Sequence, residues 1–109
     1  MLPGGFAPDY MRRNTQMLAF VCAMAAANKP VAAICHGPWM LCSARPGGPG
    51  TPPLVSGRRA TSFCAIKDDL VNAGCVYVDE AVVVDGPLIT ARTPADLTPW
   101  LHAIIGAML

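Results

Sequence analysis

Cys35 and His36 are the neighbouring pair of side chains in this sequence best suited to covalent chemistry. Cys35 follows the apolar run 31–34, and residues 36–38 (His-Gly-Pro) break a strand and can open a helix. A thiol at a strand-to-helix turn meets the free N–H groups and the positive dipole end of the helix, which favour the nucleophilic thiolate. The adjacent imidazole can serve as base or imidazolium partner. The pattern predicts a nucleophilic cysteine, with a buried packing cysteine as the alternative.

Glycines on two loops are expected to serve this turn. Gly37 leaves room for close approach of the backbone after the cysteine, and Gly4-Gly5 marks what resembles the end of a strand. Backbone N–H groups of Gly4, Gly5, His36 and Gly37 are therefore predicted to form an oxyanion hole beside the thiol.

The elements that must position the turn alternate between helix and strand. Helices are expected over 9–27, from 39, over 66–73 and from 97 to the C-terminus, with a capping box at 93–96. Strands are expected at 31–35, 60–63, 76–78, 81–84 and 88–90. Residues 46–53 contain four prolines and three glycines and are predicted to form a loop. This alternation predicts an α/β fold.

Composition excludes several classes of protein. The 109 residues suit one small domain, yet 53% are hydrophobic and only 14% charged, so much of the surface is expected to pack against something else or to belong to a larger fold. A net charge of +1 without a basic run excludes nucleic-acid and anionic-membrane binding. Five cysteines without a CxxC pair predict no disulfide framework and no metal site, and suit a reducing cytoplasm.

Five segments together resemble the PfpI family of the DJ-one/PfpI superfamily. They are PGGFAPDYMR at 3–12, AICHGPW at 33–39, GRRATSF at 57–63, IKDDLVNAG at 66–74 and VDEAVVVDGPLITARTPADL at 78–97. They occur in the family's order and cover nearly the whole chain, except for residues 46–53, which look like an inserted loop. The resemblance implies one domain over residues 1–109 with a three-layer α/β/α sandwich of flavodoxin-like kind and a mostly parallel sheet.

The resemblance also assigns roles to single residues. Cys35 would be the nucleophile and His36 its partner. The family's acidic residue after Ala-Pro falls on Asp9. In the family this acid reaches the site across a subunit interface, which implies a homo-oligomer, dimer or hexamer. From its position alone, Asp9 is equally a helix N-cap. Arg92, near the family's pocket, is a candidate for anchoring substrate through its planar fork.

The implied activity is that of a cysteine hydrolase without metal or organic cofactor. Its substrates would be methylglyoxal- or glyoxal-adducted proteins or small carbonyls, with peptide hydrolysis as a further reported activity of the family. Relatives carry a strand and helix with a cysteine-bonded glutamate ahead of the PGG segment, and no acid here takes that place, so we expect a partial domain. Some relatives have tyrosine where this chain has Phe63. A non-catalytic redox-sensing or chaperone-like protein and an inactive fragment are the alternatives.

Overall fold

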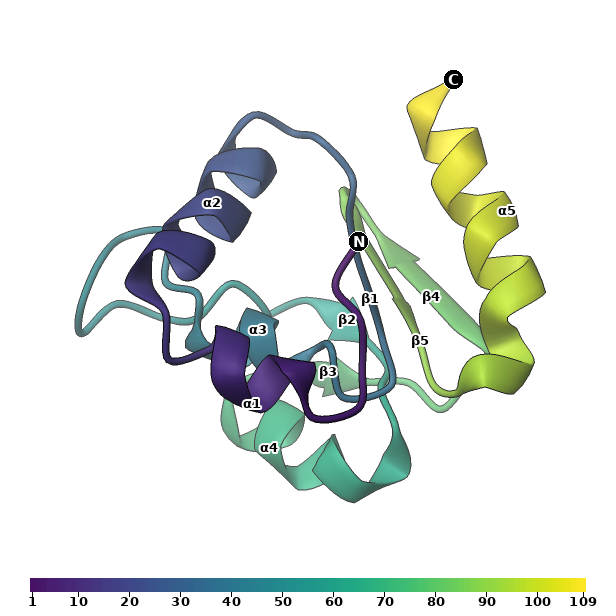
Figure 1. Ribbon diagram of the computed structural model, residues 1–109, viewed down its shortest axis with the longest axis horizontal. Helices are drawn as coiled ribbons and strands as arrows, with labels where there is room; N and C mark the ends of the chain where they lie inside the picture. The colour runs from purple at the N-terminus through teal and green to yellow at the C-terminus, as the bar shows by residue number, and fades with distance from the viewer.

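The computed structural model describes residues 1–109, with strands forming a central layer and helices on both sides (Figure 1). The helices are α1 (Ala7–Met11), α2 (Thr15–Ala26), α3 (Trp39–Ser43), α4 (Lys67–Asn72) and α5 (Leu97–Met108). The strands are β1 (Val31–Ile34), β2 (Arg59–Ala60), β3 (Val76–Tyr77), β4 (Val82–Asp85) and β5 (Leu88–Ala91). The 3-10 turns η1 (Cys64–Ile66) and η2 (Pro94–Asp96) lead into α4 and α5. This arrangement confirms the predicted α/β class.

Most strand pairs are parallel, as predicted. β1 pairs with β5, β2 pairs with β3, and only the β4–β5 hairpin is antiparallel. On the free edge of β1, Leu2 pairs in parallel with Ala33 and its N–H donates to the Ala32 carbonyl at 2.7 Å. The segment before Gly4-Gly5 is therefore strand-like, and the glycine loop leaves the sheet at the same end as Cys35.

β1 is covered on both faces, which explains its unbroken apolar sequence. Val31 and Ala33 belong to the larger core between the sheet and α2, α3 and α4. Ala32 and Ile34 point the other way and pack with Trp100 and Ile104 of α5. Burying each large side chain of α5 contributes about 1.5–3 kcal/mol to folding. The rigid strand that carries Cys35 is thus held from two sides.

The predicted helix over 9–27 is two helices. α1 ends at Met11 and α2 begins at Thr15, because the Asn14 side chain caps α2. Its carbonyl oxygen accepts the N–H groups of Gln16 and Met17 at 2.9 and 3.1 Å. An asparagine that bonds the backbone in this way competes with a continuous helix and favours a cap.

The predicted strand over 60–63 is also shorter than expected, since β2 ends at Ala60. The Thr61 N–H donates to the Thr90 hydroxyl at 2.9 Å, and the Phe63 N–H donates to the Cys35 carbonyl at 2.9 Å. These bonds draw the chain away from β3 and toward the turn after β1.

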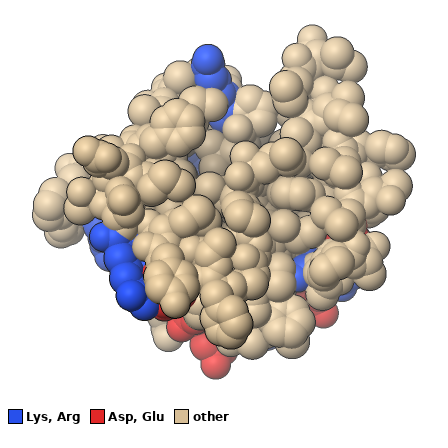
Figure 2. Space-filling model, in the orientation of Figure 1, with Lys and Arg blue, Asp and Glu red and all other residues tan.

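The surface repeats the apolar bias of the composition. The face in Figure 2 carries no charged residue at its centre, and the Lys, Arg, Asp and Glu atoms lie toward its rim. Several large apolar side chains are more than half exposed: Met1, Phe6, Tyr10, Phe20, Val76, Ile105, Met108 and Leu109. Residues 46–53 form a loop, as predicted. No helix has the length and apolar character needed to cross a membrane.

Candidate active site

Cys35 occupies the sharp turn between β1 and α3, as the sequence predicted, and its backbone is in the left-handed region with φ +62°. Its N–H donates to the Ala91 carbonyl at 3.1 Å, and its carbonyl accepts the Phe63 N–H at 2.9 Å. A left-handed conformation costs an L-residue roughly 1–2 kcal/mol. The two flanking strands hold the cysteine in this geometry, which is the strained strand-to-helix turn of a nucleophile elbow.

Two glycines pack so closely around the elbow that neither tolerates a side chain. A Cβ on Gly4 would lie 2.7 Å from the Cys35 Cβ and 3.3 Å from its Sγ. A Cβ on Gly37 would lie 2.5 Å from the Leu2 carbonyl oxygen and 2.9 Å from that of Ile34. The close approach predicted for Gly37 is confirmed.

The predicted oxyanion donors divide into two groups. The Gly37 N–H is already used, because it donates to the Ile34 carbonyl at 2.8 Å. Gly37 therefore contributes its missing side chain and not a free donor, which corrects the prediction. The N–H groups of His36, Gly4 and Gly5 donate no hydrogen bond within the chain and remain available near the thiol.

The His36 ring is oriented toward the thiol. Its Nδ1 lies 3.2 Å from the Cys35 Sγ. The ring sits between two aromatic side chains, with centroids 5.2 Å from both Trp39 and Phe63. Both His36 and Cys35 are half-buried, and the His36 Nε2 has no hydrogen-bond partner in the chain. The pair has the nucleophile–base contact that thiol chemistry needs, without a third group to orient the base.

Asp9 does not join this pair within one chain. It lies in α1, where its carboxylate accepts from the Arg13 guanidinium, and its side chain is 47% exposed. The structure contradicts the N-cap interpretation, because Phe6 is the capping residue and no side chain caps α1.

Arg92 follows β5 and is held by two carboxylates. Its Nε and Nη2 donate to Asp96 at 3.1 and 3.4 Å, and its Nη1 donates to Asp79 at 3.0 Å. Hydrogen bonds from Asp96 and then Asp79 raise the pKa of Arg92, and the Arg92 hydrogen bond lowers the pKa of Asp96. The predicted capping box of Thr93 and Asp96 is present.

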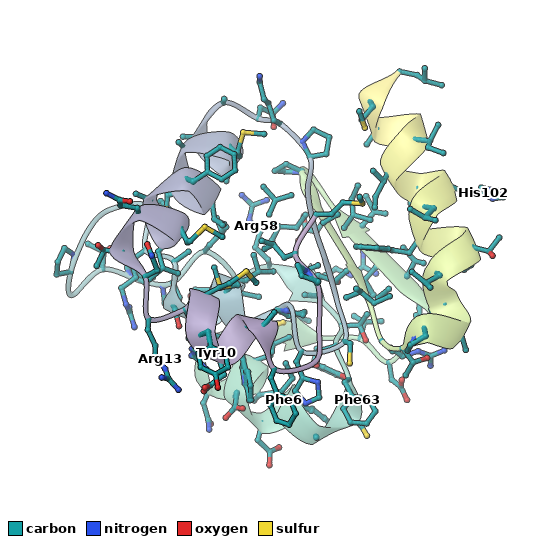
Figure 3. All side chains as sticks on the ribbon, viewed as in Figure 1. Phe6, Tyr10, Arg13, Arg58, Phe63 and His102 are labelled. Carbon is teal, nitrogen blue, oxygen red and sulfur yellow. The ribbon has the colours of Figure 1, made fainter.

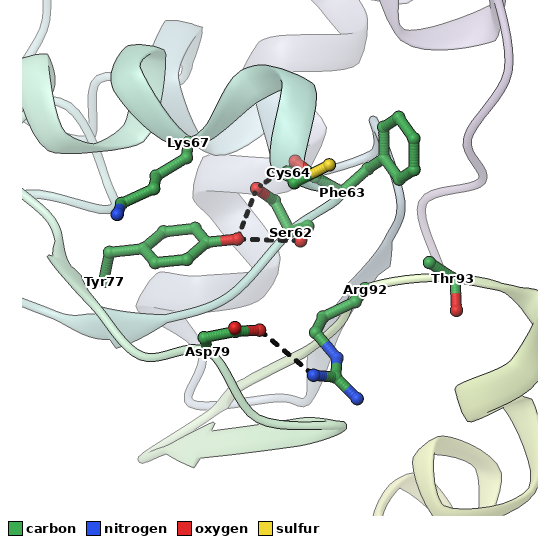
Figure 4. A pocket seen from close by; sticks show the side chains of 8 residues that line it. All are labelled: Ser62, Phe63, Cys64, Lys67, Tyr77, Asp79, Arg92 and Thr93. Carbon is green, nitrogen blue, oxygen red and sulfur yellow. Dashed lines mark hydrogen bonds and ion pairs between the residues drawn. The ribbon is translucent and has the colours of Figure 1, made fainter.

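A pocket of about 490 Å³ beside the elbow was missed by the sequence analysis (Figure 4). It is lined by Ser62, Phe63, Cys64, Lys67, Tyr77, Asp79, Arg92 and Thr93. These residues follow or end β2, β3 and β5, and ligands bind where the carboxyl ends of parallel strands meet. That rule is the signal that could have found the pocket. A phenol is present too, since the Tyr77 hydroxyl donates to the Ser62 carbonyl at 2.9 Å.

The other cysteines and His102 lie apart from the elbow chemistry. Burial raises the pKa of Cys42 to about 11 and that of Cys75 to about 11, whereas Cys64 is exposed at the pocket. His102 points outward from α5 (Figure 3). No cluster of three or more His, Cys, Asp or Glu side chains that could hold a metal ion is present.

Comparison with known proteins identifies the family to which this elbow belongs. The model of the DJ-1/PfpI family matches residues 1–107. The chain belongs to the DJ-1/PfpI family. It is 43% identical over 105 residues to Deglycase PH1704 of Pyrococcus horikoshii, covering 96% of this chain and 58% of that protein. It is 42% identical over 98 residues to Protein/nucleic acid deglycase 2 of Escherichia coli, covering 89% and 52%. The chain thus spans a little more than half the length of these curated relatives.

Solved structures of the DJ-1/PfpI family confirm the fold. A two-domain protein from Anabaena variabilis, with DJ-1/ThiJ/PfpI-like and ferritin-like domains, superposes with a TM-score of 0.89 at 46% identity. The match covers 98% of this chain and 28% of that one. The three-layer sandwich expected from the resemblance is therefore the observed architecture.

Proposed function

We propose that this DJ-1/PfpI chain is a cysteine-dependent deglycase that removes methylglyoxal or glyoxal adducts from proteins or small thiols and amines. The observation that carries the proposal is the strained elbow, with the Cys35 Sγ 3.2 Å from the His36 Nδ1. The named deglycases among its relatives support the substrate class. The whole chemistry is proposed for a chain that spans 58% of the Pyrococcus relative.

The reaction balances without an external oxidant or reductant. Cys35 displaces the protein amine or thiol from the carbinol carbon of the adduct and becomes bonded to that carbon. A hydrogen then moves from this carbon to the neighbouring ketone carbon, which oxidises the first and reduces the second. The result is a thioester on Cys35, and water hydrolyses it to lactate and the free thiol.

His36 carries the protons in this scheme. Its Nδ1 faces Sγ, so the atom bonded to Sγ comes within reach of the same nitrogen. The free N–H groups of His36, Gly4 and Gly5 would stabilise the negative charge that develops on the substrate oxygen.

Asp9 is proposed to complete the site from a second copy of the chain. The His36 Nε2 lacks a partner and Asp9 lies at the surface, where its contact with Arg13 is an exposed ion pair worth little. An acid from a neighbouring subunit could therefore exchange Arg13 for His36 at low cost. In this arrangement Asp9 orients the ring that moves the protons.

Lactate release tests the proposal directly. The purified chain is incubated with a methylglyoxal adduct of N-acetylcysteine, and lactate is measured over time. We expect release by the wild type and by Cys64→Ser, the exposed control thiol, and none by Cys35→Ser. Release that persists in Cys35→Ser would remove Cys35 from the mechanism.

Two other outcomes would move the chain to the alternatives. Cleavage of casein without lactate release would favour a peptidase. Selective oxidation of Cys35 by dilute peroxide, with no turnover of either substrate, would favour a redox-sensing protein.

A further inference from the structure

We propose that the pocket beside the elbow binds a small anionic group, a carboxylate or a phosphate, carried by the substrate. This inference rests on the proposed function for its catalytic consequence. It names the substrate class more narrowly: adducts whose carbonyl carbon lies near a negative charge. Figure 4 shows the side chains from which the site is built.

Arg92 is the oriented cation of the pocket. Asp96, with a side chain only 9% exposed, holds its Nε and Nη2 from behind. Asp96 is itself fixed by the Thr93 N–H at 3.3 Å. This clamp fixes the guanidinium plane and leaves Nη1 directed at Asp79 across the pocket wall. A guanidinium fixed on one side is prepared to bind an anion on the other.

Asp79 occupies the place that the anion would take. Its carboxylate accepts from the Arg92 Nη1 at 3.0 Å, but its side chain is 79% exposed. An exposed ion pair of this kind is worth roughly 0.2–1 kcal/mol. A carboxylate or phosphate from the substrate can therefore displace Asp79 at small cost.

Lys67 supplies a second cation that no carboxylate neutralises. It lines the same pocket, is exposed, and forms no ion pair. Its Nζ lies 5.6 Å from the centre of the Tyr77 ring, which places the charge over the pocket wall. Lys67 and Arg92 together give the pocket positive charge, against the single displaceable Asp79.

Phe63 links this pocket to the chemistry at Cys35. Its N–H bonds the Cys35 carbonyl, its ring packs on His36, and it lines the pocket. An anion held in the pocket would thus sit one residue away from the elbow. Carboxylate-bearing thiols, amino acids and phosphate-bearing nucleotides all carry such a charge near the group that is glycated.

Binding is tested first, without turnover. The Arg92 Nε–H resonance is followed by NMR during titration of the full chain with sodium lactate, with inorganic phosphate and with neutral lactamide, and Arg92→Lys assigns the signal. We expect lactate or phosphate, or both, to shift it and lactamide to leave it unchanged; which anion shifts it identifies the charge that the pocket accepts. Equal shifts with lactamide, or no shift with either anion, would overturn the proposal.

Variants locate the effect in the pocket. Lys67→Gln should weaken anion binding and Asp79→Asn should strengthen it, each roughly two- to fivefold. Lys29→Gln, before β1 at the opposite end of the sheet, and Glu80→Gln, beside Asp79 but outside the pocket, are the matched controls and should have no effect. Equal effects in the pocket variants and in their controls would contradict a local site.

Kinetics then separate this inference from the proposed function. Methylglyoxal adducts of N-acetylcysteine and of its neutral amide are compared. Lys67→Gln should raise KM roughly two- to fivefold for the carboxylate-bearing adduct only. If neither adduct releases lactate, the deglycase proposal fails and the titration still decides the pocket. If both adducts turn over and Lys67→Gln changes both KM values equally, the pocket proposal alone fails.

Discussion

The conformation of Cys35 has a consequence for stability that is independent of activity. At φ +62° an alanine retains the steric conflict of an L-residue, whereas glycine is free of it. Glycine loses more chain entropy on folding, by about 0.4–1 kcal/mol, which offsets part of the gain. The thiol is thus carried by a residue whose backbone the neighbouring strands must hold in place.

We therefore expect Cys35→Gly to be more stable than Cys35→Ala, by about 0.5–1 kcal/mol. Urea unfolding measures the difference. At Cys64, which has no positive φ, the order should reverse and alanine should be the more stable variant. The same order at both positions would mean that the elbow is not formed in solution.

Single residues also explain what the sequence could and could not predict about the site. Cys35, His36 and Gly37 were assigned from a local pattern, because an apolar strand, a breaker and a helix start are all encoded within seven residues. The engagement of the Gly37 N–H by Ile34 depends on the closed turn and has no local signal. The pocket brings together residues 62–67, 77–79 and 92–93, which only the pairing of strands places side by side.

At the level of elements, the N-terminal segment and the turn after β1 are locked against each other. Gly37 lies where a Cβ would strike the carbonyl oxygens of Leu2 and Ile34, and both are backbone atoms that cannot rotate away. Overpacking of this kind costs about 1–3 kcal/mol. The sheet edge and the elbow therefore depend on the same missing side chain.

Gly37→Ala should lower the free energy of unfolding by about 1–3 kcal/mol. Gly106→Ala is the matched control, because Gly106 lies inside α5 with nothing within 4 Å of its Cβ position. That change should raise stability by about 0.5–1 kcal/mol. Equal effects from the two substitutions, measured by urea unfolding, would show that Leu2 does not pack on the turn.

The elements themselves were predictable to differing degrees. β1, β5 and α5 were predicted nearly to the residue, because a buried strand, a hairpin turn and a capping box have strong local signals. The break between α1 and α2 was missed, since Asn14 caps a helix inside a run of good helix formers. The end of β2 was missed because Thr61 and Phe63 take partners that are distant in the sequence.

At the scale of the whole molecule, the surface around α1 favours association with a second copy. Phe6 is 87% exposed and Tyr10 66% exposed, and both flank Asp9 (Figure 3). Exposed aromatic side chains that cluster in this way are enriched at protein interfaces. An interface here would bury both rings and bring the partner's α1 to the site, as the proposed role of Asp9 requires.

Phe6→Glu should therefore reduce the oligomer and lower lactate release in parallel. Sedimentation velocity measures the first effect and the lactate assay the second. Phe20→Glu, which charges a 62% exposed phenylalanine on α2, should leave both unchanged. A fully active monomer of Phe6→Glu would contradict a site shared between subunits.

The central claim, that the chain forms a reactive thiol at Cys35, is tested most directly by labelling all five cysteines with iodoacetamide between pH 6 and 9, read by peptide mass spectrometry. Thiolates react and thiols do not. Since burial raises the pKa of Cys42 and of Cys75 to about 11, both remain protonated over this range and should stay unlabelled. We predict that Cys35 reacts first, ahead of the exposed Cys64. Labelling of all five at similar rates would mean that the elbow is not held together and that the proposed catalysis has no nucleophile.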